Sequence, residues 1–150
     1  MSLFESLTHT FGTVGTGGFG VKGDSIAGYS PALQNIITVF MILSGVNYVA
    51  YFYLITRQFK EIFKVEEIRV YFGIILVSAL FIAFNIRGLY STLEEALRHA
   101  FFQVGSVITT TGYATTDFDL WPSFSKTILL VLMVIGGCAG STGGGIKVAR

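Results

Sequence analysis

The sequence predicts an all-α membrane protein made of repeated units, each with a long helix, a short re-entrant helix with its loop, and a second long helix. Three observations predict this fold class. Hydrophobic residues make up 52% of the 150 residues and charged residues 13%, with a mean hydropathy of +0.67, unlike an ordinary soluble domain. Two segments rich in threonine and glycine, Thr16–Phe19 and Thr110–Tyr113, each end in a glycine followed by an aromatic residue. These Gly-aromatic segments lie 94 positions apart, which indicates an internal repeat. A run of glycines interrupts the last apolar segment.

The composition also excludes some functions. A formal net charge of +1 offers no basic face for a nucleic acid, so we expect no nucleic-acid partner. Cys138 is the single cysteine, so it forms no internal disulfide, and we interpret it as a small packing residue.

Residues 1–56 are expected to form the end of one unit, with a short amphipathic helix, the first Gly-aromatic segment and a long helix. No charged residue falls within Pro31–Ile55, and about 20 apolar residues suffice to cross a bilayer. Pro31 suits the first turn of this helix, where its missing N–H is no loss, and Ser30 is a candidate N-cap.

Residues 57–69 are the most charged part of the chain and include four basic residues, Arg57, Lys60, Lys64 and Arg69. The positive-inside rule places this loop in the cytoplasm. The next unit, residues 70–150, then begins with an apolar helix over 70–86 that returns through the membrane. With the loop inside, both Gly-aromatic segments lie toward the outer face.

Two further segments of this unit have an unusual pattern. Residues 91–107 open with a capping-box pattern over Ser91–Glu94 and carry a helical apolar stripe, but they are too short and polar to span, so a re-entrant helix is expected. The apolar run after Trp121-Pro122 is broken by Gly136–Gly137 and by the stretch 140–145. Each glycine costs a helix about 1 kcal/mol relative to alanine, so this run predicts a broken transmembrane helix.

The two Gly-aromatic segments have the chemistry of a potassium filter, in which backbone carbonyls replace the water shell of the ion. The residues expected to hold K⁺ through their carbonyls are Gly15, Thr16, Gly17, Gly18, Thr109, Thr110, Thr111 and Gly112. Phe19 and Tyr113 are expected to wedge outward and hold the diameter. The fold is therefore expected to be of the potassium-channel type, with the pore-helix C-termini pointing at the ion. Threonine hydroxyls are candidate ligands at the inner end, and K⁺ is the only metal expected.

Three motifs resemble the TrkH/KtrB superfamily of potassium transporters: Thr13–Phe19, Ile108–Asp117 and Gly136–Lys147. The resemblance covers nearly the whole chain and implies a polypeptide with four helix–pore loop–helix repeats around one pore. This chain then matches an internal fragment from the pore helix of the second repeat to the broken helix of the third. Gly18 and Gly112 match the filter glycines of successive repeats. With one matching glycine in each filter, the resemblance implies a looser site than that of a dedicated potassium channel.

The resemblance also implies an intramembrane gate below the filter, a multi-pass location in the cell inner membrane, a homodimer, and cytoplasmic nucleotide-binding regulatory subunits. No cofactor is implied. The gate residues implied are Gly136, Gly137, Gly140, Ser141, Thr142, Gly143, Gly144 and Gly145. Close packing of helices through small residues is the alternative interpretation of this run.

The leading functional hypothesis is potassium uptake across the cytoplasmic membrane, and the alternative within transport is a less selective monovalent-cation channel. A membrane-embedded enzyme is remote, because the expected spans contain no Asp, Glu, Lys or Arg before Lys147. The Gly15–Gly20 match to G-x-G-x-x-G neither follows a predicted strand nor opens a helix, which argues against dinucleotide binding. His9 and His99 are expected to pack or hydrogen-bond rather than bind metal. Two interpretations stay open for Asp117 and Asp119: they are solvated acids of a loop, or they concentrate cations at the mouth of the pore.

Overall fold

The computed structural model describes residues 1–58, 60 and 65–150, and within these residues the chain is helical without a strand. The all-α fold class predicted from the sequence is therefore confirmed. The helices, in chain order, are α1 (Leu3–Val14), α2 (Pro31–Ser44), α3 (Tyr48–Ile55), α5 (Glu66–Ile86), α6 (Leu93–Ile108) and α7 (Ser123–Ile135), with short 3-10 turns at Arg87–Leu89 and Phe118–Leu120.

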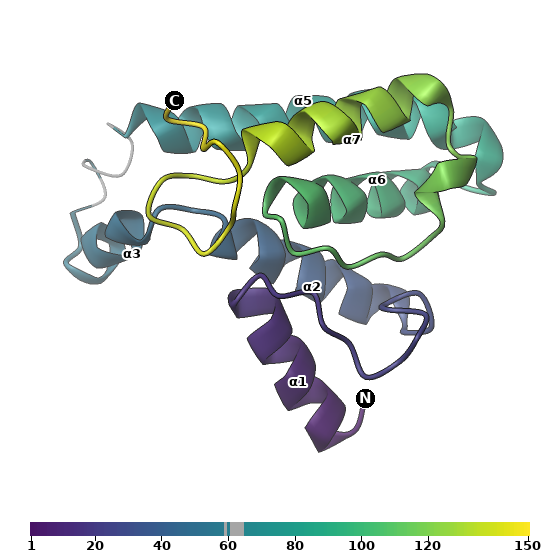
Figure 1. Ribbon diagram of the computed structural model, residues 1–150, viewed down its shortest axis with the longest axis horizontal. Helices are drawn as coiled ribbons and strands as arrows, with labels where there is room; N and C mark the ends of the chain where they lie inside the picture. The colour runs from purple at the N-terminus through teal and green to yellow at the C-terminus, as the bar shows by residue number, and fades with distance from the viewer. Residues whose placement is uncertain (59, 61–64) are drawn as a thin grey trace.

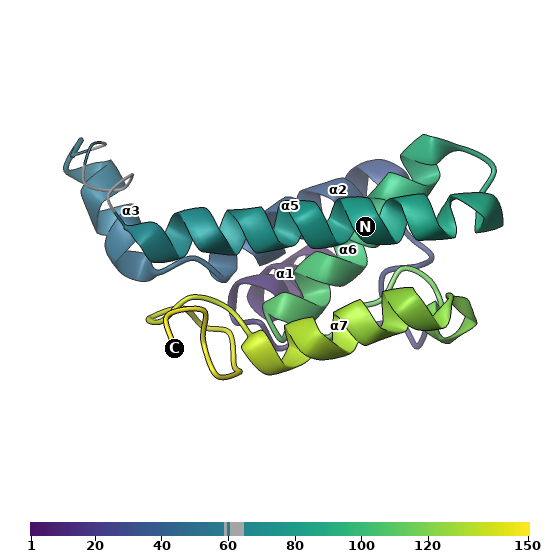
Figure 2. The same ribbon diagram turned by 90° about the horizontal axis from the view of Figure 1, so that it is seen from above.

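Helix α6 lies at the centre of the packing and contacts α2, α5 and α7. Figures 1 and 2 show α5 and α7 side by side, with α6 between them and α2, while α1 lies on the far side of α2. Because α6 is surrounded in this way, nine of its residues are buried although it is the most amphipathic part of its unit. A short polar helix at this depth fits the predicted re-entrant helix.

Helix α5 supplies the longest apolar element. Together with its 3-10 turn, the stretch Glu66–Leu89 is the one helix of the described residues that is long and apolar enough by itself to cross a membrane. Only 28% of its most apolar window is buried, so large apolar side chains such as Phe81 and Phe84 face outward. The outward-facing apolar surface is typical of a helix in contact with lipid. Helix α7 is apolar but shorter.

The prediction of one continuous helix over Pro31–Ile55 is wrong. Helix α2 ends at Ser44 and α3 starts at Tyr48, and their axes differ by 96°. Asn47 caps α3 by accepting a hydrogen bond from the backbone N–H of Val49 at 2.9 Å. The chain therefore bends between the Gly45 cap that ends α2 and the Asn47 cap that begins α3.

Helix starts differ from the sequence predictions in three places. Pro31 does begin α2, but the Ser30 side chain makes no capping hydrogen bond. The cap of α6 is Thr92 rather than Ser91, and its hydroxyl accepts from the backbone N–H of Glu95. Helix α5 begins at Glu66, so the last four residues of the range 57–69 are helical, while 59 and 61–64 lie outside the described residues.

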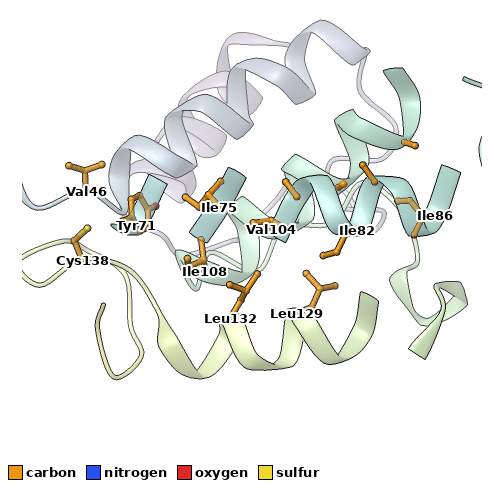
Figure 3. Packing of buried hydrophobic residues seen from close by; sticks show 14 of the residues in the cluster. Val46, Tyr71, Ile75, Ile82, Ile86, Val104, Ile108, Leu129, Leu132 and Cys138 are labelled. Atoms are coloured by element: carbon orange, nitrogen blue, oxygen red, sulfur yellow. The ribbon is translucent and has the colours of Figure 1, made fainter. Parts of the chain in front are cut away.

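The main core lies where α5, α6 and α7 meet, as Figure 3 shows with Ile82, Val104, Leu129 and Leu132 pointing toward one another. Burying each such side chain stabilises the fold by about 1.5–3 kcal/mol. A second buried cluster joins the loop after α1 to α2 and α6; its members are Ile26, Tyr29, Ile37, Met41, Phe102 and Tyr113. The second cluster therefore connects the two predicted units.

Candidate functional site

The two Gly-aromatic segments have the same backbone hydrogen-bond pattern, shifted by 94 residues. The first segment follows the end of α1 at Val14, and the second follows the end of α6 at Ile108. After α1 the bonds are Thr16 N–H to Thr13 O (3.2 Å), Gly17 N–H to Gly12 O (2.8 Å) and Gly18 N–H to Gly12 O (3.3 Å). After α6 they are Thr110 N–H to Val107 O (3.0 Å), Thr111 N–H to Ser106 O (2.9 Å) and Gly112 N–H to Ser106 O (3.3 Å). The sequence repeat is therefore also a structural repeat.

Both segments hold two residues with positive φ at matching positions. Thr16 and Thr110 have φ of +49° and +56°, while Gly18 and Gly112 have φ of +68° and +87°. A left-handed conformation costs an L-residue such as threonine about 1–2 kcal/mol, so the surrounding hydrogen bonds must impose it. The same left-handed backbone therefore recurs in both Gly-aromatic segments.

The two segments touch each other at Gly18. A Cβ atom added to Gly18 would overlap the carbonyl oxygen of Thr111 and lie 2.9 Å from its carbonyl carbon. Only a glycine fits there, so the backbone of the first segment lies directly against the Thr111 carbonyl of the second. This contact joins the two segments, Gly15–Gly18 and Thr109–Gly112, that are expected to hold K⁺.

The two aromatic residues differ in their environment. Tyr113 is fully buried in the second cluster, and its hydroxyl donates to the carbonyl of Phe19 at 3.2 Å. The Phe19 side chain is 80% exposed. Tyr113 thus joins the second filter segment to the first, whereas Phe19 contributes its backbone carbonyl to that link. The role of both in holding the filter diameter stays a prediction.

The glycine run ends α7 and folds back as a loop. Gly136 follows the last residue of α7 with φ of +75°, as expected for a residue that stops a helix. The loop closes on itself through Ile146 N–H to Val134 O (3.1 Å), Lys147 N–H to Ile135 O (2.8 Å) and Val148 N–H to Gly137 O (3.1 Å). In Figure 1 this is the yellow loop, which returns past the end of α7 toward the C-terminus. The predicted break of the helix at Gly136 is confirmed.

The loop contacts both Gly-aromatic segments. The hydroxyl of Thr16 donates to the carbonyl of Thr142 at 3.1 Å, and the hydroxyl of Thr110 accepts from the backbone N–H of Gly144 at 2.6 Å. Thr16 and Thr110 occupy equivalent positions of the repeat. The loop therefore hydrogen-bonds the same threonine in each filter, an arrangement the sequence did not reveal because the partners are 126 and 34 residues apart.

The loop also packs into the break between α2 and α3. The backbone N–H of Cys138 donates to the Gly45 carbonyl at 3.0 Å, and the N–H of Tyr48 donates to the Gly140 carbonyl at 3.1 Å. A Cβ on Gly45 would lie 2.8 Å from a Thr109 methyl carbon, so no side chain fits there. Helices α2 and α7 thus both end beside Thr109, at the start of the second Gly-aromatic segment.

Two charged residues hold the loop and were not singled out by the sequence patterns as functional. The Glu67 carboxylate, on the first turn of α5, accepts from the backbone N–H of Ala139 at 2.5 Å. The Lys147 ammonium donates to the carbonyl of Gly143 within the loop. A charge-assisted bond is about twice as strong as a neutral one, so these two contacts favour the observed position of the loop.

The histidines behave as predicted for packing residues. His99 lies 2.8 Å from the Thr115 hydroxyl and stacks on the Tyr90 ring. His9 lies between the hydroxyls of Tyr29 and Tyr113. Within the described residues no group of three His, Cys, Asp or Glu side chains forms a metal site.

The two loop acids form a local turn. Asp117 accepts a hydrogen bond from the backbone N–H of Asp119 at 3.0 Å, and Lys126 donates to the Asp119 carbonyl at 3.1 Å. Both alternatives for these acids stay open.

The Gly15–Gly20 motif follows the end of helix α1 and does not join a strand to a helix. It therefore lacks the geometry that dinucleotide binding requires.

Comparison with known proteins identifies relatives along the whole chain. The family model described as TrkH, a cation transport protein, matches residues 1–88 and 90–150. The Trk system potassium uptake protein TrkH of Escherichia coli K12 is 38% identical across the full chain, and TrkG of the same strain is 34% identical. The chain spans 32% of the length of each of these relatives.

A solved structure agrees with these matches. The crystal structure of the potassium transporter TrkH from Vibrio parahaemolyticus superposes with a TM-score of 0.93 at 35% identity, covering all of this chain and 33% of that one. The predicted class of all-α membrane protein is confirmed by this likeness. This chain belongs to the TrkH family of cation transport proteins.

Proposed function

We propose that this chain contributes two walls of a four-walled potassium filter and the gate beneath it to a potassium uptake protein. The relatives it matches are named potassium uptake proteins, and the chain is about a third of their length, so the other two walls would come from further repeats. In this proposal the carbonyls of Gly15–Gly18 and Thr109–Gly112 replace water around a K⁺ ion.

The observation that carries the proposal is the contact between the loop and the filter. Thr16 and Thr110 occupy equivalent positions of the two filter segments, and both are hydrogen-bonded to the loop of 136–145. We infer that ion passage requires the loop to move, which breaks these two bonds and frees the threonine hydroxyls toward the ion.

Rubidium uptake tests the function. The full-length transporter would be expressed in cells that lack their own potassium uptake, and Rb⁺ entry would be followed with increasing Na⁺ as competitor. Saturable Rb⁺ uptake that Na⁺ inhibits only at large excess is expected. Equal competition by Na⁺ would favour the less selective monovalent-cation channel.

The gate is tested by replacing Gly143–Gly145 with alanines. A Cβ on Gly143 would lie 2.9 Å from the Thr109 carbonyl oxygen and one on Gly145 2.6 Å from Gly136, so the loop cannot keep its position. We expect altered uptake with unchanged amounts of protein in the membrane. Gly73→Ala in α5 is the control, because a Cβ there meets nothing within 4 Å. Unchanged uptake in the triple variant would contradict the gate.

The remaining features of the proposal come from the family resemblance. They are location in the cell inner membrane, a homodimer of the full-length protein, and cytoplasmic nucleotide-binding subunits. Purification of the full-length protein from membranes, together with any bound subunits, tests these features. The membrane-enzyme alternative is set aside because the matched relatives are named as uptake proteins. K⁺ is the transported substrate in this proposal, and no cofactor is expected.

A further inference from the structure

The residue that follows each filter glycine has its carbonyl bonded to a hydroxyl of the protein. In the first Gly-aromatic segment this is the Phe19 carbonyl, which accepts a hydrogen bond from the Tyr113 hydroxyl at 3.2 Å. In the second it is the Tyr113 carbonyl, which accepts from the Ser106 hydroxyl at 2.5 Å. Ser106 and Tyr113 are both fully buried. Each segment is thus held by one buried hydroxyl directly after its glycine.

The two hydroxyls come from different places in the repeat. Ser106 lies on α6, the helix that leads into the second segment, so this segment is held by its own helix. The equivalent position on α1, 94 residues earlier, is Gly12, which has no side chain. The first segment is held instead by Tyr113 of the following unit. The same carbonyl position therefore receives its donor from its own unit in one case and from the next unit in the other.

Gly12 and Tyr113 fit each other. A Cβ atom on Gly12 would overlap the Tyr113 hydroxyl and would lie 3.1 Å from the Phe19 carbonyl oxygen. A serine hydroxyl at position 12 would thus be within reach of the same carbonyl, but only in the absence of the tyrosine hydroxyl. The Tyr113 hydroxyl therefore takes, beside α1, the place that the Ser106 side chain takes on α6.

Positions 12 and 106 also hold the segments through their backbone. In each unit the carbonyl oxygen at this position accepts hydrogen bonds from the N–H of the filter glycine and from the N–H of the residue before it. With the hydroxyl bond added, the backbone is fixed both at the filter glycine and at the residue after it. The carbonyl of the glycine lies between these two anchors.

His9 is compatible with this arrangement. Its Nδ1 atom lies 3.4 Å from the Tyr113 hydroxyl. A neutral ring that carries its proton on Nδ1 donates to this hydroxyl, which leaves the tyrosine proton for the Phe19 carbonyl. The bond between the two segments therefore requires no charge on the histidine.

We propose that Ser106 and Tyr113 are positioning residues for ion selectivity: each hydroxyl anchors the carbonyl after one filter glycine and thereby fixes the carbonyl of the glycine itself. The inference deepens the proposed function and rests on it. Because the Phe19 and Tyr113 carbonyls are bonded to these hydroxyls, the row of carbonyls offered to the ion ends at Gly18 and Gly112. Loss of either hydroxyl loosens the end of that row, which lowers the cost of closing around the smaller Na⁺ ion.

The test measures the Na⁺ concentration that halves Rb⁺ uptake by the full-length transporter. Tyr113→Phe removes only the hydroxyl and should lower this concentration roughly fivefold, the ratio that one net hydrogen bond represents. Ser106→Ala should lower it by a similar factor. Ser125→Ala is the matched control, because Ser125 is also fully buried but its hydroxyl bonds Asn85, outside both segments. This control should behave as the unaltered protein does.

A change in the source of the hydroxyl separates positioning from a merely structural role. Gly12→Ser combined with Tyr113→Phe moves the donor from the tyrosine to α1, as in the second unit, and should restore most of the resistance to Na⁺. Gly12→Ala combined with Tyr113→Phe adds the same Cβ without a hydroxyl and should stay at the level of Tyr113→Phe. Gly12→Ser alone should impair uptake, because its Cβ overlaps the tyrosine hydroxyl.

Equal Na⁺ inhibition in the two double variants would overturn the role of Tyr113, and Na⁺ inhibition in Ser106→Ala equal to that in Ser125→Ala would overturn the role of Ser106. Both results would leave potassium uptake itself intact. Ser106→Ala provides the test even where the changes at positions 12 and 113 lower the amount of protein. Absence of Rb⁺ uptake by the unaltered transporter would instead contradict the proposed function.

Discussion

Alanine substitution of Gly18, in the first Gly-aromatic segment, should impair uptake in two ways. Gly18 has a left-handed backbone angle, φ of +68°, so the substitution costs about 1–2 kcal/mol in backbone strain. The added methyl group also overlaps the Thr111 carbonyl, which must move away. Gly18→Ala therefore adds displacement of a proposed ion ligand to the backbone strain.

Strain of 1–2 kcal/mol corresponds to a change of about 5- to 30-fold in an equilibrium. We expect Gly18→Ala to raise the Rb⁺ concentration for half-maximal uptake by at least this factor and to lose discrimination against Na⁺. The assay is Rb⁺ uptake with Na⁺ competition, normalised to the amount of each variant in the membrane, with Gly73→Ala as the control. Uptake and Na⁺ discrimination in Gly18→Ala equal to those in Gly73→Ala would refute the reasoning.

Three further predictions concern the loop and the core. Thr110→Val removes the acceptor for the Gly144 N–H and should increase ion leak, measured as Rb⁺ efflux from preloaded vesicles; a leak equal to that of the unaltered protein would count against the contact. Glu67→Gln replaces a charge-assisted bond to the Ala139 N–H by a weaker one and should raise efflux in the same assay, by less than tenfold. Ile82→Ala empties a fully buried position in the core and should lower the free energy of unfolding by about 2–5 kcal/mol, seen as a lower melting temperature in detergent; an unchanged melting temperature would speak against this packing.

Local sequence patterns were sufficient to predict those features whose structure depends on a single segment of the chain. The two Gly-aromatic segments follow amphipathic helices, so the repeat and the short helices α1 and α6 were predictable. The break at Gly136 was also predictable, because the dense glycine run disfavours any helix, whatever its surroundings.

The features that the sequence did not predict depend on contacts between segments far apart in the chain. Gly45 and Asn47 sit in an apolar run that a single glycine and a single polar residue do not interrupt by themselves. The break between α2 and α3 depends on the loop, whose Cys138 N–H and Gly140 carbonyl bond the freed backbone groups. The bonds from the loop to Thr16 and Thr110 likewise join segments that no local pattern relates.

The most direct test of the account is the location of the ion. A structure of the full-length transporter in Rb⁺, with anomalous scattering to identify the ion, should show Rb⁺ between the carbonyls of Gly15–Gly18 and those of Thr109–Gly112, with the loop of 136–145 on the inner side. An Rb⁺ peak elsewhere in a protein that transports Rb⁺, or coordination without either segment, would contradict the assignment of these two segments as filter walls.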